Sequence, residues 1–425
     1  MLKPIIYNGE SAETLFGSRA ELTDSVESAV RAIIADVRAR GDAAVREYAQ
    51  KFDGYVGDGF EVSELEYAQA ERAVAPEYAE TLRRAAQNIS EFHSRQKRDG
   101  FEIQKDGSIV GQKVIPLARA AIYIPGGTAA YPSTVLMNAI PAKIAGVGEV
   151  IMATPVKSDG KVKPEVLAAA RLCGVDRVLK IGGAHAVAAL AYGTESVPKV
   201  DKITGPGNIY VATAKRLVAG TACGIDMLAG PSEILVVADC GANAEHVAAD
   251  MLSQAEHDRS ASAILICDST ELAERVIERL YERVQALPRR DIAAASLDNN
   301  CKIIVTDSVA TAVELADGYA PEHLELCVKD PLPLLKKVRN AGSVFLGYNT
   351  PEAVGDYFAG ANHTLPTSGT ARFSSPLGVD DFVKTTQYIY YGADALQAAA
   401  ADISRFARSE GLIAHAESVE VRTGK

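Results

Sequence analysis

Two neighbouring side chains of the sequence could bind one metal ion. Gln254 and His257 lie three residues apart in a helical pattern, so both project from one face of the helix. That face could present an amide oxygen and an imidazole nitrogen to the same ion. Zinc rarely takes an amide oxygen, however, and the Glu-His pairs of the chain do not extend to the HExxH motif of zinc proteases. By itself the spacing is therefore a weak indication of a metal site.

A second candidate is the adjacent pair Glu322 and His323, which directly precedes a predicted strand. An acid beside an imidazole could divide two proton transfers if burial adjusts both pKa values. A loop glutamate next to a hydrogen-bonded histidine is the structural alternative. The pair alone does not distinguish between these two interpretations.

Two further segments are polar where the chain is not regular. Residues 355–367 have the composition of a loop, and such loops often carry function, although a long capped turn is the alternative. The polar side chains of this loop are Asp356, Tyr357, Asn362 and His363. In the C-terminal tail, Glu410 and His415 flank a glycine that is typical of a helix end.

Three glycine-rich turns occur where strands are predicted to end: Ile124–Thr128, Ile181–His185 and Thr204–Asn208. Glycine in such turns lets backbone N–H groups approach a phosphate at a helix N-terminus. Tight turns without a ligand are the alternative, and the GxGxxG dinucleotide motif is absent. Three such turns in one predicted domain nevertheless indicate a binding crevice at the carboxyl ends of its strands.

The elements that must position these residues alternate between strand and helix. Residues 18–50 and 65–97 have helical periodicity, and from about residue 102 short β-branched runs alternate with helical stretches. The predicted strands are 120–124, 150–153, 177–181, 234–238, 261–267, 302–306, 324–328 and 343–346. This order is typical of parallel βαβ units. We therefore predict an α/β fold with two doubly wound, incomplete Rossmann-like domains and small helical N- and C-terminal extensions.

Length and charge set the broad class. The chain has 425 residues, more than the about 250–300 that one core supports, so at least two packed units are expected. A net charge of −11 without a basic run argues against nucleic-acid or anionic-membrane binding. No apolar stretch approaches the roughly 20 residues of a membrane span, and the apolar stretch at the N-terminus is too short for a signal peptide. Six scattered cysteines argue against a disulfide framework or a sulfur zinc site, so we expect a cytoplasmic protein.

Taken together and in this order, seven segments closely resemble the histidinol dehydrogenase family, the zinc- and NAD-linked enzymes of the last steps of histidine biosynthesis. The resemblance covers nearly the whole chain. The segments that carry it are Tyr123–Gly127, Gly205–Asn208, Ala229–Glu233, Ser253–His257, Ala320–Leu326, Gly355–Thr367 and Glu410–His415.

The resemblance implies one zinc ion per subunit and a homodimer. Gln254, His257 and Asp356 would bind the metal together with His415, which the family draws from the tail of the partner subunit. The exchanged tail would explain why a segment too short to form its own core ends in a histidine. The residues implied in substrate binding are Ser232, Gln254, His257, His323, Asp356, Glu410 and His415.

The family reaction is a four-electron oxidation of L-histidinol to L-histidine through L-histidinaldehyde, with two NAD used in succession. By resemblance, His323 is the base of the hydride steps and Glu322 activates the water that attacks the aldehyde. The resemblance also implies NAD contacts at Tyr123, Asn208 and position 185. The family usually has glutamine at that third position, whereas this chain has His185. Imidazole lacks the paired donor and acceptor of an amide, so we expect weaker or pH-dependent NAD binding.

The resemblance further implies how the chain divides. The expected units are a first α/β domain of residues 25–122 with 236–373, a second, NAD-binding domain of residues 123–235, a small extension of residues 1–24 with 374–396, and a helical tail of residues 397–425 that docks on the partner.

Three other functions remain open at this point. A related zinc- and NAD-linked dehydrogenase could act on another amino or sulfonate alcohol. A metal-dependent hydrolase could use Glu322 to activate a zinc-bound water, but it would have no use for the glycine-rich turns. A non-catalytic dimer joined by zinc is the third alternative.

Overall fold

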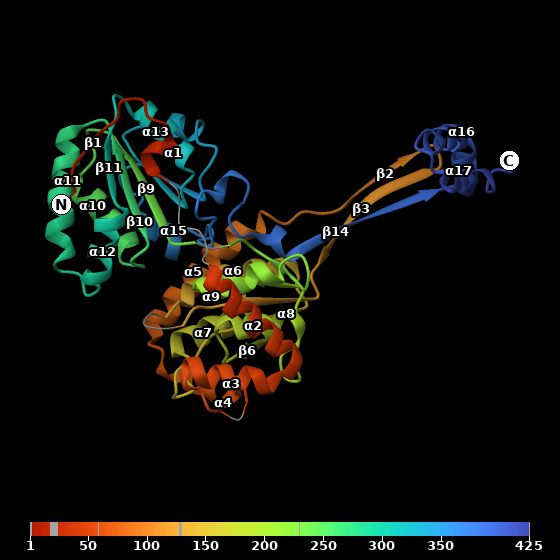
Figure 1. Cartoon of the computed structure of the whole chain (residues 1–425), viewed down its shortest axis with the longest axis horizontal. Coiled ribbons are helices and arrows are strands. Elements are labelled where there is room, and N and C mark those ends of the chain that lie inside the picture. The colour runs from red at the N-terminus through yellow and green to blue at the C-terminus, as the bar shows by residue number, and fades with distance from the viewer. Residues whose placement is uncertain (1, 18–23, 58, 127–129, 229, 425) are drawn as a thin grey trace.

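The computed structural model describes residues 2–17, 24–57, 59–126, 130–228 and 230–424. Gly127 and Thr128 of the first glycine-rich turn and Ala229 lie outside these residues. The chain forms two α/β lobes from which a long β arm protrudes, and two helices lie at the far end of the arm (Figure 1). The predicted α/β fold with two wound units is confirmed.

The first lobe is built on a parallel six-stranded sheet in the order β1-β11-β10-β9-β12-β13. Its strands are β1 (Ile5–Ile6), β9 (Glu233–Ala238), β10 (Ser262–Cys267), β11 (Lys302–Val305), β12 (His323–Cys327) and β13 (Ser343–Leu346). One face packs against α10 (Ala244–Ala255), α11 (Thr270–Val284) and α12 (Arg290–Asn300). The other packs against α1 (Ala12–Phe16), α13 (Val309–Tyr319) and α14 (Leu332–Leu335). With both faces covered, the central strands are continuous apolar runs.

The second lobe contains a parallel five-stranded sheet in the order β6-β5-β4-β7-β8. Its strands are β4 (Arg119–Tyr123), β5 (Glu149–Ala153), β6 (Arg177–Leu179), β7 (Lys202–Thr204) and β8 (Gly224–Ile225). One face is covered by α4 (Glu64–Ala73), α5 (Pro76–Ser94), α6 (Pro132–Ala145) and α7 (Pro164–Leu172). The other is covered by α2 (Asp24–Arg40), α3 (Asp42–Asp53), α8 (Gly183–Tyr192) and α9 (Ile209–Val218).

This packing corrects the expected domain boundaries. Helices α2 to α5 bury their apolar faces on the five-stranded sheet, so they do not group with residues 236–373 as expected. Residues 1–24 and 374–396 do not form one extension either, because β1 pairs with β11 whereas residues 383–391 belong to the arm. The periodicity of the helices was local information, and only the fold determines which sheet they cover.

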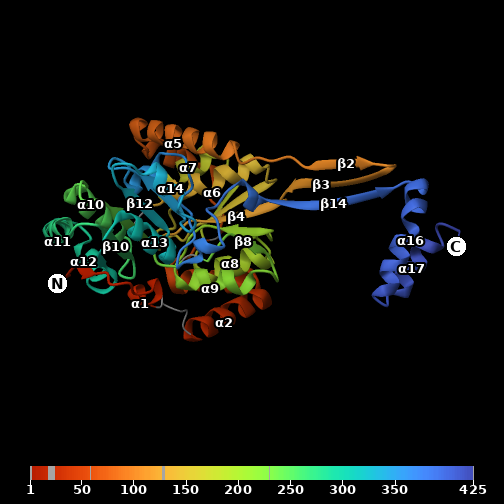
Figure 2. The same ribbon diagram turned by 90° about the horizontal axis from the view of Figure 1, so that it is seen from above.

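The arm was missed by the sequence analysis. Strands β2 (Phe101–Lys105), β3 (Ser108–Pro116) and β14 (Val383–Tyr391) form an antiparallel sheet in the order β14-β3-β2. Asp106 and Gly107 both have positive φ between β2 and β3, as a type I′ hairpin turn requires. Helices α16 (Ala393–Ser409) and α17 (Ile413–Glu420) pack on each other at its far end, so the tail is helical as expected (Figure 2).

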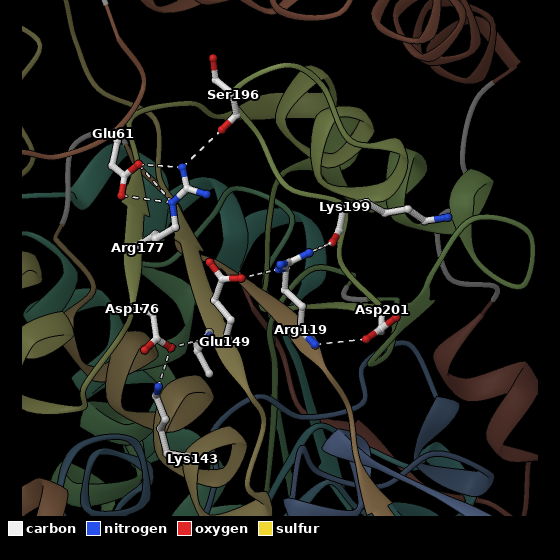
Figure 3. Close-up of polar contacts among 10 residues, drawn as sticks. Glu61, Arg119, Lys143, Glu149, Asp176, Arg177, Ser196, Lys199 and Asp201 are labelled. Carbon is white, nitrogen blue, oxygen red and sulfur yellow. Dashed lines mark hydrogen bonds and ion pairs between the residues drawn. The ribbon is translucent and has the colours of Figure 1, made fainter.

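The amino ends of strands β4, β5 and β6 are occupied by a polar network (Figure 3). Arg119 pairs with Glu149, and Arg177 pairs with Glu61, which lies just before α4 in the chain. Such exposed pairs add little stability individually. They nevertheless fill this edge of the sheet, so the opposite, carboxyl edge, where the glycine-rich turns lie, is the one that can receive a ligand.

Candidate active site and metal centre

The amino ends of β9 and β12 hold the acid and imidazole of the Glu322-His323 pair. His323 is the first residue of β12 and is 4% exposed, and its Nδ1 lies 3.0 Å from the carbonyl oxygen of Glu233. A carbonyl can only accept, so this contact places the proton on Nδ1 and leaves Nε2 for the site. The N–H of Glu233 donates to Glu322 Oε2 at 2.9 Å. One residue of the neighbouring strand therefore positions both side chains, and the half-buried Ser232 lies next to it.

Helix α15 (Glu352–Tyr357) brings two carboxylates to the same place. Glu352 and Asp356 are four residues apart and share one helix face. His323 Nε2 lies 3.7 Å from Asp356 Oδ1 and 4.0 Å from Glu352 Oε1. His363 Nδ1 lies 3.1 Å from the carbonyl oxygen of Asp356. The sequence analysis missed Glu352, although its spacing from Asp356 was an available signal.

Helix α10 contributes the predicted amide. Gln254 is fully buried near its C-terminal end, and the N–H of His257 donates to the Gln254 carbonyl at 3.1 Å. His257 lies just beyond the end of the helix and is exposed. Asp356 and His323 are among its charged neighbours. The structure therefore brings Gln254, His257 and Asp356 to one site, although the two members of the first pair do not share a continuous helix.

Burial and neighbouring charges set the protonation of the cluster. Burial raises the pKa of Glu322 to about 8 and that of Glu352 to about 7. Burial acts to lower the pKa of His323, but the charges of Glu352, Glu322 and Asp356 outweigh it and raise that pKa well above its ordinary value. Burial acts to raise the pKa of Asp356, yet contact with His323 and the charges of His363 and His257 hold it below the usual value. Asp356 is thus the carboxylate that stays ionised.

Two buried atoms of the cluster have no hydrogen bond. Asp356 Oδ1 and His323 Nε2 find no hydrogen-bond partner within the described part of the chain. Unsatisfied buried polar atoms are rare, and a bound ion is one of the groups that can satisfy them. Carboxylate, imidazole and amide oxygen are donors that suit zinc as a borderline ion. The residues present therefore fit the metal centre that the sequence led us to expect.

The tail residues are not part of this cluster within one chain. Glu410 ends α16 and His415 lies in α17, and both are exposed at the far end of the arm (Figures 1 and 2). The lobe that carries α10 and α15 is at the opposite end of the molecule. Within one chain, the arm therefore holds Glu410 and His415 away from the cluster.

The predicted dinucleotide contacts lie at the carboxyl edge of the five-stranded sheet. Tyr123 ends β4, and its hydroxyl accepts the N–H of Gly183 at 2.9 Å. Asn208 caps α9, and its side-chain oxygen accepts two helix N–H groups at 3.1 Å, which leaves its NH₂ group as a donor. A Cβ atom on Gly205 would collide with the carbonyl oxygen of Tyr123, and its φ is +102°. Glycine is therefore needed for this close approach of the turn to the strand.

His185 lies in a different environment from the one we expected. It is 1% exposed, the rings of Tyr48 and Phe52 on α3 lie 5.9 and 6.1 Å away, and neither ring nitrogen bonds to another described residue. Burial lowers the pKa of His185 to about 4. The imidazole is therefore neutral at physiological pH, which removes the reason to expect pH-dependent NAD binding there.

Hydrogen bonds join the two lobes beside the candidate metal ligand Asp356. Thr134, in the first turn of α6, lies 3.3 Å from His363 Nε2 through its hydroxyl. Asn362 donates to the carbonyl oxygen of Met137 on the same helix at 2.7 Å. Helix α6 follows the glycine-rich turn after β4, so the amino edge of the six-stranded sheet adjoins the lobe that carries the predicted dinucleotide contacts.

Comparisons with known proteins agree with this arrangement. The family model described as histidinol dehydrogenase matches residues 18–423. The chain is 50% identical over 428 residues to the histidinol dehydrogenase of Lactococcus lactis, covering 99% of each chain. It is 52% identical over 404 residues to that of Geobacillus kaustophilus, covering 95% of each. The crystal structure of histidinol dehydrogenase from Elizabethkingia anophelis aligns with a TM-score of 0.93 at 36% identity, covering 99% of this chain and 98% of that one. The chain belongs to the histidinol dehydrogenase family.

Proposed function

We propose that this protein oxidises L-histidinol to L-histidine through L-histidinaldehyde at a zinc site that the tail of a second copy completes. The family makes it an NAD-linked oxidoreductase of histidine biosynthesis. The observation that carries the detailed proposal is the buried pair of Asp356 Oδ1 and His323 Nε2, which lack hydrogen bonds among the described residues; His323 lies beside Glu352, which contacts Gln254.

Gln254, His257 and Asp356 would hold the zinc ion, with His415 of the partner subunit as a fourth ligand. When bound, zinc supplies a Lewis acid that anchors the imidazole and amine of the substrate. Asp356 stays ionised because neighbouring imidazoles lower its pKa, and this suits a ligand of a divalent cation. Ser232 of the same chain would contact the substrate around this centre, together with Glu410 of the partner subunit.

His323 would accept the proton of the substrate hydroxyl. Its Nδ1 is occupied by the carbonyl of Glu233, so Nε2 is the atom available for this step. NAD supplies the hydride acceptor in both oxidations. The surrounding carboxylates, which raise the pKa of His323, stabilise the imidazolium that proton transfer creates.

Glu322 would activate the water that attacks the aldehyde. Burial raises its pKa to about 8, which makes its carboxylate a stronger base than an ordinary glutamate near neutral pH. The N–H of Glu233 fixes one of its oxygens. Tyr123, His185 and Asn208 would hold NAD across the lobe junction.

Exposed apolar residues of the arm support the proposed homodimer with exchanged tails. Phe101 and Ile103 on β2, Ile389 on β14 and Phe406 on α16 are 56%, 59%, 72% and 69% exposed. A three-stranded arm with two helices is too small to form a core of its own, and an apolar surface of this kind favours a partner. Pairing of two arms would carry Glu410 and His415 to the site of the other copy.

We propose that the enzyme works in the cytoplasm, as the sequence analysis led us to expect. Among the described helices, none has the combination of length and apolar character that a membrane crossing requires.

The decisive test measures NADH formed per L-histidinol consumed by zinc-loaded protein. Two NADH per substrate, lost when a chelator removes zinc and regained when zinc is returned, are expected. One NADH would mean that the aldehyde leaves before the second oxidation. None, from folded dimeric protein, would favour an alcohol dehydrogenase for another amino or sulfonate alcohol, and turnover without NAD would favour a metal-dependent hydrolase.

A further inference from the structure

We infer that Glu352 is a positioning residue that turns the side-chain oxygen of Gln254 toward the metal. The inference rests on the proposed function, because it takes Gln254 as a metal ligand. It assigns a further role to a buried carboxylate that the sequence analysis did not find and that the proposed reaction uses only as one of the charges around His323.

The amide of Gln254 can face the site in two ways, and only one is useful. Its oxygen can bind a cation, whereas its NH₂ group cannot. With the nitrogen turned to Glu352, Gln254 donates to Oε2 at 2.8 Å and makes a closer contact with Oε1. The opposite orientation would place the amide oxygen against the carboxylate, two acceptors together. Because Gln254 is fully buried, water cannot relieve that repulsion.

Glu352 is itself held firmly enough to direct another side chain. It is 3% exposed, and its own N–H donates to Glu325 Oε1 at 2.8 Å. Glu325 stands two residues after His323 on β12, so both point from the same face of the sheet. The carboxyl of Glu325 also contacts that of Asp250, one turn before Gln254 on α10. Strand β12 thus links the first residue of α15 to the helix that carries the amide.

The hydrogen bonds separate the role of Glu352 from that of Asp356. The oxygens of Glu352 receive donors from Gln254 and, at 3.4 Å, from the hydroxyl of Ser253. Asp356 Oδ1, one turn later on the same helix, receives none from any residue that the structure describes. A carboxylate with its hydrogen bonds made, behind the proposed ligand Gln254, and a carboxylate oxygen without one, on Asp356, match the division between supporting groups and metal ligands.

The first test measures the zinc affinity of metal-free protein by competition with a chromogenic chelator. Glu352→Ala removes the acceptor, and we expect an affinity about 10–100-fold lower, as for other supporting groups of metal ligands. Glu66→Ala in the other lobe is the matched control, because it removes a partly buried glutamate bonded to Lys180 and to the cap of α4. Its zinc affinity should equal that of the wild type even if its melting temperature falls.

An exchange of the two side chains tests orientation apart from folding. Gln254→Glu alone sets two carboxylates against each other and should bind zinc poorly. Adding Glu352→Gln restores one donor and one acceptor, with a carboxylate oxygen toward the metal. We expect the double variant to bind zinc at least about ten-fold more tightly than the single one, a coupling that a merely structural role would not produce.

The outcomes separate this inference from the proposed function. Wild-type zinc affinity in folded Glu352→Ala, or no recovery in the double variant, would overturn the role of Glu352. Gln254→Leu is the reference, and it should lower zinc affinity whatever Glu352 does. If Gln254→Leu also binds zinc like the wild type, the proposed metal centre itself is wrong.

Discussion

The ring of His323 is held by the main chain of a neighbouring strand, because its Nδ1 lies 3.0 Å from the carbonyl oxygen of Glu233. The same residue donates its N–H to Glu322. Acid and base are therefore fixed by parallel pairing of β9 and β12 rather than by a separate orienting side chain. The proposed proton-transfer groups thus lie at the first residue of a strand and directly before it, and strands maintain geometry better than loops do.

Replacing His323 by asparagine should abolish histidinol oxidation. Asparagine removes the nitrogen that accepts the hydroxyl proton, and general-base catalysis contributes about 10²–10⁴-fold in rate. The measurement is NADH formation with saturating NAD and histidinol. Zinc content and dimer size serve as controls, and both should match the wild type. Full NADH production by this variant would contradict the assignment of the base.

Mixing two inactive variants tests the exchanged tail. His415→Ala removes the proposed metal ligand of the tail, and His323→Asn removes the proposed base in the body of the chain. In a mixed dimer, one site combines an intact body with the intact tail of the other subunit. After dissociation and random reassociation, about one quarter of wild-type activity should return. Each variant reassociated with itself is the control. If the mixture stays as inactive as its components, the tail does not complete the partner's site.

Gly205→Ala should lower the affinity for NAD beyond any effect of its lower folding stability. The added Cβ would collide with the carbonyl oxygen of Tyr123 and push the glycine-rich turn away from β4. Gly220→Ala is the matched control, since Gly220 also has positive φ but an added Cβ would meet no described atom within 4 Å. Both should lose about 1–2 kcal/mol of stability from the backbone strain alone. Calorimetric titration with NAD should show a further loss of affinity only for Gly205→Ala.

The burial of His185 should make stability depend on pH in a defined window. Its folded pKa is about 4, against an ordinary value of 6.5. Between these values the unfolded chain binds more protons, so stability rises with pH through the window and is fully present above pH 6.5. Protonation of His185 should therefore lower the free energy of unfolding by about 3 kcal/mol between pH 7 and pH 4.

The measurement compares urea unfolding of the wild type and of His185→Gln across that range. Glutamine does not titrate, so the difference between the two proteins should grow as pH falls below 6.5. NAD affinity of the wild type should not vary between pH 6 and 8 on account of this residue. A constant difference in stability from pH 7 to pH 4 would show that His185 is not buried as a neutral ring.

Local pattern identified most elements but not all of them. The apolar strands and amphipathic helices of both lobes follow from side-chain periodicity, which is a property of neighbouring residues. The hairpin of β2 and β3 had a signal in Asp106-Gly107, yet β2 is exposed along its length and lacks an apolar run that marks a strand. Glu352 was missed because a carboxylate in a short helix looks like any surface glutamate until its burial is known.

The ligand role of Asp356 and the acid–base roles of Glu322 and His323 were implied by the family resemblance, whereas the residues by themselves indicated the α/β class and the candidate pairs Gln254–His257 and Glu322–His323. These are matters of composition, spacing and residue type. Only the tertiary structure decided that the metal-side residues lie at the amino edge of one sheet, adjoining the lobe whose carboxyl edge carries Tyr123 and Asn208. Only the tertiary structure shows that His185 is buried beside α3 and that His415, on α17, lies far from the lobes of its own chain. The physical reason is that burial and proximity arise when distant segments pack together, and no local pattern contains the partner against which a side chain will pack.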